Sequence, residues 1–302
     1  MSLAIRISRA APLVTLQDAG RFGYLQHGVS ASGPMDQGAY GRAGDRLGKA
    51  GAAIEFTRAG LAFEVEGGGV RAAFDGGAFA LTQNGKPQPW PVALELESGD
   101  RVDIAPGDRG LYGYVRFDHE LAVEPLMGSR ATNLVAGLGG FEGRALRAGD
   151  RLPLQAIEGE APPVAVHDVL PVDGPIRFVW GLHADLFKPA TRQNFMTAKF
   201  AVSRKLDRMG VRLDDSQRVF GEAQILSLVS DAIVPGDIQI LGDGTPIVLM
   251  RDHQPTGGYP RIGTVISADF DRFAQLRVGS EVSFVPVTTQ KAHGLYLASQ
   301  RP

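Results

Sequence analysis

Cysteine is absent from the 302 residues of this chain. This absence excludes disulfide bonds, thiolate metal sites, iron–sulfur clusters and cysteine nucleophiles. The six histidines show no zinc-type pairing, because no two of them lie within five residues of each other. We therefore expect no metal site in this chain.

Neither sign of charge is in excess, since 31 basic and 33 acidic residues leave a net charge of −2. Such a balance gives no bulk attraction to nucleic acid or to anionic lipid. No apolar run approaches the roughly 20 residues of a membrane span, and residues 1–6 lack the pattern of a signal peptide. We expect a cytoplasmic protein that binds neither nucleic acid nor membrane.

Three common catalytic or nucleotide-binding motifs are also missing. A phosphate-binding loop at Gly48-Lys49 fails at both ends, where Ala43 and Ala50 stand in the required positions. The glycine cluster at residues 137–143 misses the dinucleotide-binding spacing and predicts a flexible turn. No Gly-x-Ser-x-Gly nucleophile elbow occurs in the sequence.

Glycine, in contrast, is abundant: the chain has 39 glycines and 19 prolines without a collagen period. The triplet Gly-Asp-Arg recurs at residues 44–46, 99–101, 107–109 and 149–151. Glycine tolerates positive φ and aspartate bonds the nearby backbone, so Gly-Asp favours a turn that starts a strand. Three of the four triplets precede short apolar segments, which predicts many short strands and tight turns.

The clearest strand candidates are residues 61–66, 177–180, 247–250 and 281–285. Helices are few: residues 36–47 form one candidate, and residues 267–276 form a better one that Ser267 can cap. The pattern predicts a mainly β fold of barrels or sandwiches, with fewer than about a quarter of the residues in helix. Four prolines in residues 155–175 predict an extended linker, which separates domains at residues 1–160 and 161–302.

Two polar, glycine-rich segments are candidate sites. In residues 15–36, carboxamides, carboxylates and an arginine alternate with glycines, as in loops that bind a small anion or amide. An equally good interpretation is a turn stabilised by an Asp18–Arg21 pair. Residues 251–260 follow an apolar strand, where sites are often built, or they form a solvated hairpin connection.

Six motifs in these and other segments resemble the biotin-dependent carboxyltransferase family, which includes allophanate hydrolase subunit 2-like proteins, Kip antagonist proteins and the C subunit of 5-oxoprolinase. They occur in the family's order at residues 15–23, 33–36, 128–132, 139–150, 203–213 and 252–260. The resemblance implies two cyclophilin-like β-barrel domains. This sequence departs from the usual family pattern at Gly44 and Lys49, where the family has asparagines, and at Gly76-Gly77, where the family has Gly-Ala.

The resemblance also implies a function: a subunit of an ATP-dependent 5-oxoprolinase, which opens 5-oxoproline to glutamate together with partner subunits A and B. On this interpretation the complex uses ATP, and the chain alone binds no cofactor. One alternative is a carboxyltransferase that moves a carboxyl group from carboxybiotin, on a separate carrier, to urea or a similar small amide. Another is a regulatory antagonist that binds a kinase-inhibitor protein.

Urea and 5-oxoproline share a planar amide whose carbonyl must be polarised by fixed donors while a carboxylate orients or deprotonates a neighbouring group. On the matching motifs, we expect catalytic roles for four residues: Asp18, Arg21, Asp36 and Asp252. We expect six to bind substrate: Gln17, Arg130, Asp207, Arg208, Gln254 and Tyr259. Arg21→Ala or Asp252→Ala should then abolish activity and leave folding intact. Since sites form where domains meet, we expect both segments, with Arg130 and Asp207-Arg208, to line one cleft, either between the two barrels or between this chain and its B partner.

Overall fold

The computed structural model describes residues 2–157, 174–221 and 228–299. Its backbone contacts divide the chain into two compact units: unit 1 holds Met1–Phe22 and Ala31–His167, and unit 2 holds Gly23–Ser30 and Asp168–Arg301. The expected boundary between residues 160 and 161 and most of the expected linker lie outside the described residues. Strands account for 37% and helices for 16%, which confirms the mainly β class.

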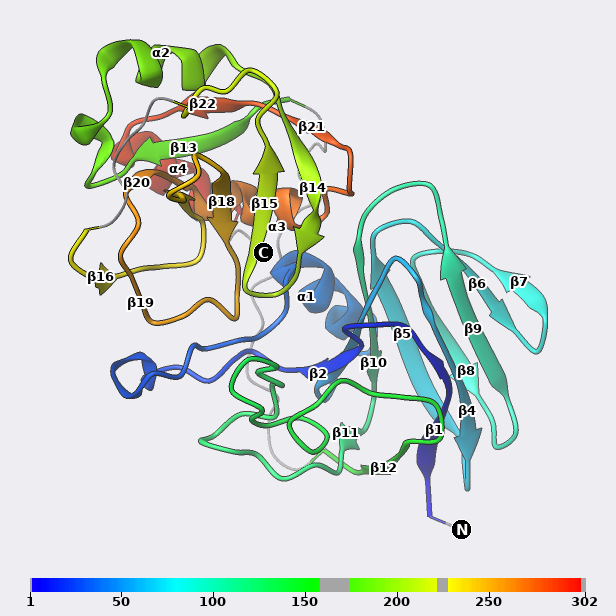
Figure 1. Cartoon of the computed structure of the whole chain (residues 1–302). Helices are drawn as coiled ribbons and strands as arrows, with labels where there is room; N and C mark the ends of the chain where they lie inside the picture. The colour runs from blue at the N-terminus through cyan, green and yellow to red at the C-terminus, as the bar shows by residue number, and fades with distance from the viewer. Residues whose placement is uncertain (1, 158–173, 222–227, 300–302) are drawn as a thin grey trace. The chain divides into compact units, whose positions relative to one another are not determined.

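Unit 1 contains two sheets (Figure 1). The seven-stranded sheet has the order β11 (Glu120–Leu121), β12 (Arg151–Gln155), β1 (Ala4–Ala10), β4 (Leu61–Glu66), β9 (Arg101–Pro106), β6 (Phe79–Gln83) and β7 (Lys86–Gln88). The five-stranded sheet has the order β2 (Thr15–Gln17), β3 (Ala53–Thr57), β10 (Tyr112–Phe117), β5 (Val70–Gly76) and β8 (Val92–Leu96). All of the described pairings in these sheets are antiparallel.

The core of unit 1 is an apolar cluster to which both sheets contribute. Phe63 and Ile104 come from the seven-stranded sheet, and Phe74 and Val115 from the five-stranded one; all four are fully buried. Alternating side chains of a strand point to opposite faces, so each sheet turns one apolar face inward. Helix α1 (Gln37–Asp45) packs against β5 and β10.

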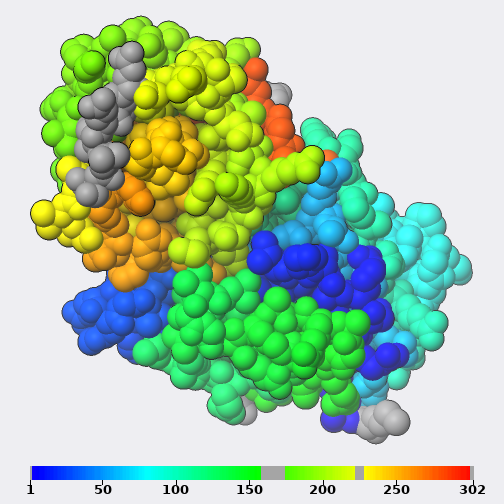
Figure 2. Space-filling view, in the orientation of Figure 1, coloured from blue at the N-terminus to red at the C-terminus, as the bar shows by residue number. Residues whose placement is uncertain are grey.

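Residues 122–150 connect β11 to β12 and are largely irregular. They form a continuous part of the surface of unit 1, green in Figure 2. The segment is tied to the edge near β2, because the Thr132 amide donates to the Leu16 carbonyl at 2.8 Å and the Leu146 amide to the Val14 carbonyl at 2.7 Å. These bonds bring the motif at residues 128–132 next to the end of β2.

Unit 2 is built on an eight-stranded sheet that nearly closes into a barrel. Its order is β21 (Glu281–Val282), β14 (Phe200–Leu206), β15 (Gly210–Asp214), β18 (Pro246–Leu249), β17 (Asp237–Ile240), β20 (Arg261–Val265), β13 (Ile176–Trp180) and β22 (Phe284–Pro286). The two outermost strands, β21 and β22, are separated in the chain by Ser283 alone. A sheet whose two edges are joined by one residue must curl round upon itself.

The smaller elements of unit 2 are a two-stranded sheet and short helices. The sheet pairs β16 (Asp231–Ala232) with β19 (Thr256–Gly257). The helices are α2 (Pro189–Thr197), α3 (Ser267–Ala274) and α4 (Thr289–Ser299), with 3-10 turns η1 (Leu25–His27) and η2 (Ala184–Leu186). None of the helices in the described ranges is long and apolar enough to cross a membrane.

Several local predictions are confirmed and others are wrong. The strand at 61–66 has the predicted bounds, and the Gly-Asp turns at 99–100 and 149–150 precede β9 and β12 with positive φ at Gly99 and Gly149. The strand at 281–285 is instead broken at Ser283. Ser267 does not cap α3: Ile266 occupies the N-cap position, and no side chain bonds there.

Candidate functional site

The carboxylate of Asp18 holds the turn that follows β2. It accepts hydrogen bonds from the Gly20 amide at 3.0 Å, from the Ser129 hydroxyl at 2.6 Å and from the Arg130 amide at 2.6 Å. An ionised carboxylate only accepts, so these donors match it well. Asp18 is half-buried and joins two motifs that are more than a hundred residues apart in the sequence.

Arg21 lies almost fully buried beside this turn, with 1% of its surface exposed. Its guanidinium donates to the carbonyl oxygens of Leu126 at 2.9 Å and Ala131 at 2.8 Å. A Cβ atom at Gly139 would stand 2.4 Å from this guanidinium, which accounts for a glycine there. The turn is thus held by separate bonds of Asp18 and Arg21 to residues 126–131 and not merely by the local pair that the sequence suggested.

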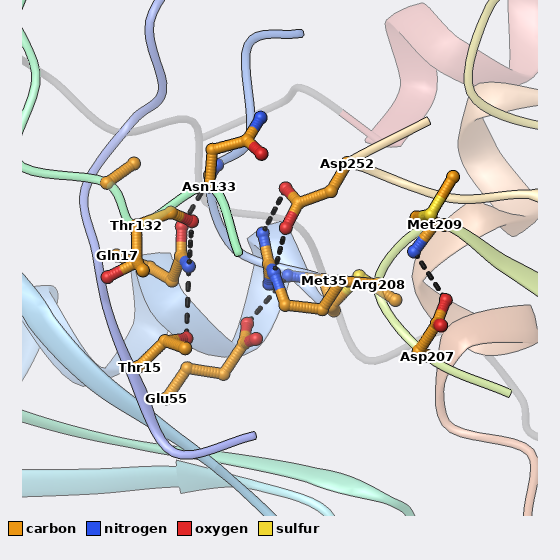
Figure 3. A network of polar contacts seen from close by, with 12 residues as sticks. Thr15, Gln17, Met35, Glu55, Thr132, Asn133, Asp207, Arg208, Met209 and Asp252 are labelled. Atoms are coloured by element: carbon orange, nitrogen blue, oxygen red, sulfur yellow. Dashed lines mark hydrogen bonds and ion pairs between the residues drawn. The ribbon is translucent and has the colours of Figure 1, made fainter. Parts of the chain in front are cut away.

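Gln17 joins three segments through its fully buried amide (Figure 3). Its nitrogen donates to the Thr15 hydroxyl and to the Thr132 carbonyl, both at 3.0 Å, and its oxygen accepts from the Gly33 amide at 3.1 Å. Both ends of the amide are therefore engaged within unit 1.

Asp36 caps helix α1. Its carboxylate accepts from the Ala39 amide at 2.8 Å, which satisfies an otherwise unpaired donor of the first helical turn. Its own amide donates to the Tyr114 hydroxyl, and that hydroxyl donates to Glu55 at 2.7 Å. Burial raises the pKa of Tyr114 well above 10, with the nearby Glu55 charge adding to the shift. Sequence reasoning missed Glu55, whose signal is an acidic residue inside the apolar strand β3.

Arg130 and Tyr40 complete the polar groups near Asp18. The Arg130 guanidinium donates to the Val123 carbonyl at 2.8 Å and lies 3.4 Å from Glu120, with 23% of the side chain exposed. Burial raises the pKa of Tyr40 to about 12; the Arg116 charge opposes this shift, and the charges of Asp18 and Glu120 add to it.

The departures from the family pattern have local explanations. Arg116 is buried under α1, where its guanidinium lies 4.0 Å above the Tyr40 ring. A Cβ atom at Gly44 would stand only 2.3 Å from that guanidinium, so an asparagine there would require Arg116 to move. Lys49 donates to the Ile157 carbonyl at 2.8 Å. A Cβ atom at Gly77 would come within 2.8 Å of the Gly110 backbone.

In unit 2, Arg208 and Asp252 form a buried ion pair (Figure 3). The guanidinium donates through two nitrogens to the two carboxylate oxygens, at 2.9 and 3.0 Å. Their side chains are 2% and 0% exposed. The Asp252 amide also donates to the Arg208 carbonyl at 2.7 Å, which fixes the loop after β18 to the β14–β15 hairpin.

Three further predicted residues are more accessible. Asp207 is exposed, and its carboxylate accepts from the amides of Met209 and Gly210 in the turn between β14 and β15. Gln254 is half-buried and Tyr259 is 39% exposed. At this exposure the side chain of Tyr259 is in contact with solvent.

His253, next to Asp252, is a second residue that sequence reasoning missed. Its ring is 4% exposed, and its Nδ1 lies 2.6 Å from the Gln254 carbonyl. This contact assigns the proton to Nδ1 and leaves Nε2 as an acceptor. Burial lowers the pKa of His253, although the carbonyl contact and the charges of Asp237 and Asp252 oppose the shift.

The ten predicted residues therefore fall into two groups. Unit 1 holds Gln17, Asp18, Arg21, Asp36 and Arg130; unit 2 holds Asp207, Arg208, Asp252, Gln254 and Tyr259. A cleft shared by the two groups stays a prediction. Within the described ranges, no group of three or more histidine or acidic side chains is arranged to hold a metal ion.

Fold and site together define a mainly β protein of two sheet-built units with polar loops at strand ends. A family model described as carboxyltransferase domain, subdomain A and B, matches residues 27–286, and the chain belongs to this family. The C subunit of 5-oxoprolinase from Escherichia coli is 34% identical over 291 residues, which cover 95% of this chain and 93% of that protein. The corresponding 5-oxoprolinase protein of Haemophilus influenzae is 32% identical over 286 residues, with 92% and 89% covered. These relatives confirm the resemblance found in the motifs.

Solved structures of the same fold belong to much longer proteins. The urea amidolyase of Kluyveromyces lactis superimposes with a TM-score of 0.86 at 25% identity, covering 98% of this chain and 19% of that chain. The urea carboxylase of the same yeast gives 0.86 at 26% identity, with 98% and 28% covered. This chain therefore spans 19% of one of these enzymes and 28% of the other.

Proposed function

We propose that this chain is the C subunit of a 5-oxoprolinase, which acts in a complex that opens 5-oxoproline to glutamate with ATP. The observation that carries the proposal is the match to the bacterial 5-oxoprolinase proteins, which covers nine-tenths or more of both chains in the Escherichia coli comparison. A match of this extent aligns the chain with nearly the full length of that subunit. Both of those relatives are named as subunits, which supports work in a multi-subunit assembly.

The burial of the ten residues suggests which of them hold the structure and which contact the substrate. Gln17, Arg21, Asp36, Arg208 and Asp252 are buried and bonded within the chain, so we assign them to holding the loops in place. Asp18, Arg130, Asp207, Gln254 and Tyr259 keep some exposure, so we assign substrate contact to them. Fixed donors and acceptors of this kind polarise an amide without reorganising during the reaction.

The proposal includes partner subunits A and B, with ATP used by the complex and no cofactor held by this chain alone. It also includes a cytoplasmic location, which fractionation of cells that produce the protein can test. The central experiment is reconstitution with the A and B proteins of the same organism. Purified complex, ATP and 5-oxoproline should release glutamate, and omission of this chain or of ATP should abolish the release. A stable complex that forms no glutamate would overturn the proposal.

Carboxyl transfer to urea is a second candidate, favoured by the likeness to the yeast urea carboxylase over 98% of this chain. In that case the carboxyl group comes from carboxybiotin on a separate carrier protein. The same preparation, given a carboxybiotinylated carrier and urea, would then lose the carboxyl group from the carrier only when urea is present. Glutamate formation without any urea-dependent loss would decide for the first candidate.

A further inference from the structure

His253 stands in the loop after β18, between two residues of the motif at residues 252–260. Its ring is almost fully buried, with 4% of the residue exposed. Nδ1 lies 2.6 Å from the carbonyl oxygen of Gln254, and a carbonyl oxygen can only accept a hydrogen bond, so the ring carries its proton on Nδ1. The other nitrogen, Nε2, is then a hydrogen-bond acceptor.

The Nε2 atom of His253 reaches the surface. It has no hydrogen-bond partner among the residues that the structure describes. In this part of the chain, the side-chain nitrogens that are sealed from solvent without a partner include Nε2 of Gln239 and Nε1 of Trp90, but not Nε2 of His253. The small exposed area of the ring therefore includes this atom. An acceptor that reaches solvent from an otherwise buried ring is placed to receive a donor from outside the chain.

Bonds on both sides of His253 fix the orientation of the ring. The His253 amide donates to the Met250 carbonyl at 3.2 Å, and the Nδ1 contact stops the imidazole from turning over. Two residues further on, the Pro255 carbonyl accepts from the Ile233 amide at 3.4 Å, and β19 then pairs with β16. The acceptor is thus oriented before a ligand arrives, which reduces the entropy that binding must cost.

The imidazole is neutral at neutral pH. Burial lowers its pKa and the Arg251 charge adds to this shift, while the carbonyl contact and the charges of Asp237 and Asp252 oppose it. Both carboxylates are themselves paired: Asp252 with Arg208, and Asp237, which lies on β17, with Arg261 of β20. A neutral ring keeps the lone pair of Nε2 available for a hydrogen bond.

We propose that Nε2 of His253 accepts a hydrogen bond from the N–H of the small amide substrate. This inference rests on the proposed function and adds a contact at a position that the family motif leaves open. Because its lone pair accepts and cannot donate, Nε2 fits an amide N–H and not a carbonyl oxygen or a carboxylate. Both 5-oxoproline and urea carry such an N–H. Gln254 and Tyr259, to which we assign substrate contact, belong to the same loop.

The test compares His253→Asn and His253→Gln in the complex with subunits A and B, at a temperature where both variants are folded. The asparagine amide can replace Nδ1 as a donor to the Gln254 carbonyl but has no atom at the position of Nε2, which the longer glutamine side chain reaches. We expect the KM for 5-oxoproline to rise about tenfold in His253→Asn, as for the loss of one substrate hydrogen bond, and by less in His253→Gln. A KM in His253→Asn equal to that of the wild type would overturn the proposal.

The pH dependence of KM separates this contact from a structural role. Once the ring gains a second proton, Nε2 becomes a donor and can no longer accept the substrate N–H. The KM of the wild type should therefore rise as pH falls through the pKa of His253, which lies below its usual value of 6.5. His253→Gln has no proton to gain there and should lack this rise. The same rise in both proteins would contradict the contact.

A wild-type complex that forms no glutamate would contradict the proposed function separately. In that event the contact is tested on the full chain by nitrogen NMR of its imidazoles, with 2-pyrrolidinone, which has an amide N–H, and with N-methyl-2-pyrrolidinone, which has none. A shift of the His253 Nε2 signal with the first lactam alone supports the proposal, and a shift with both or with neither overturns it. His183 is the internal control: its Nδ1 already accepts from the Arg261 amide at 3.2 Å, so its signals should stay unchanged.

Discussion

Unit 1 and unit 2 each bury an arginine beside a predicted site loop, but the acceptors differ. In unit 1, Arg21 donates to the carbonyl oxygens of Leu126 and Ala131. In unit 2, Arg208 donates through two nitrogens to the carboxylate of Asp252. Carbonyl dipoles stabilise a positive charge without cancelling it, whereas a paired carboxylate neutralises it.

The difference separates two uses of a buried charge. The Arg208–Asp252 pair fastens one loop to one hairpin and sets a buried negative charge against a buried positive one. The Arg21 guanidinium fastens residues 126–131 to the turn of Asp18 through carbonyl oxygens. We therefore expect both arginines to stabilise the fold, and the ion pair in unit 2 to be the more costly of the two to break.

The largest effect should follow from breaking the buried ion pair. Asp252→Ala leaves the Arg208 charge buried without its carboxylate, and we expect a loss of about 3–5 kcal/mol in the free energy of unfolding, measured with urea. This replaces the expectation from the sequence that folding would survive the change. The double variant Arg208→Met/Asp252→Leu should recover most of the loss. If Asp252→Ala keeps wild-type stability but loses activity, the two arginines do not differ as argued.

Arg21→Ala should cost about 2–3 kcal/mol, because the buried carbonyl oxygens of Leu126 and Ala131 lose their donor. Arg21→Lys keeps the positive charge but cannot reproduce the fork of donors, so it should recover only part of this loss. If the charge itself polarises the substrate, Arg21→Lys should also retain more kcat than Arg21→Ala at a temperature where both are folded. Equal kcat in the two variants would leave Arg21 with a purely structural role.

The pH dependence of stability should distinguish the two units, because the effect of Tyr40 lies above pH 10 and that of His253 below pH 6.5. Burial raises the pKa of Tyr40 in unit 1 to about 12. Between pH 10 and pH 12 the unfolded chain therefore loses this proton while the folded chain keeps it. The free energy of unfolding should fall by up to roughly 3 kcal/mol over this range. Burial lowers the pKa of His253 in unit 2, so stability falls as pH drops from 6.5 through the folded pKa. Unfolding curves of Tyr40→Phe should show a smaller alkaline slope than the wild type, because Tyr114 still contributes to it, and those of His253→Gln a smaller acidic slope. Unchanged slopes would contradict the assignment.

The smallest effect on stability is expected at Tyr259. Its side chain is 39% exposed, so Tyr259→Phe should change the free energy of unfolding by no more than about 0.5 kcal/mol. If the hydroxyl contacts the substrate, the KM for 5-oxoproline should nevertheless rise. A KM equal to that of the wild type would remove Tyr259 from the site and weaken the role of unit 2 in binding.

Local sequence signals predicted much of the fold. The alternation of apolar and polar residues predicted the bounds of β4, and the Gly-Asp turns predicted the starts of β9 and β12. Both signals depend only on neighbouring residues. Helices α2 and α4 were missed, since each buries a single residue and therefore lacks an apolar stripe. The break at Ser283 depends on pairing with two distant strands, which no short window contains.

The site was predicted less completely because its bonds are long-range. The loop of Asp18 could be recognised from residue types, but its partners Ser129 and Arg130 lie 111 and 112 residues away. His253 was passed over because a lone histidine carries no spacing pattern, and only its burial sets it apart.

The arrangement of β21 and β22 has a consequence for folding during synthesis on the ribosome. All the other strands of the eight-stranded sheet precede residue 266, and their outer edges at β14 and β13 are completed only by Glu281–Pro286. Until that short segment leaves the exit tunnel, the nascent chain carries two open strand edges that can pair with other chains. Residues 281–286 thus complete both edges of the sheet, and chaperones that shield strand edges would be needed most while this segment is still inside the exit tunnel.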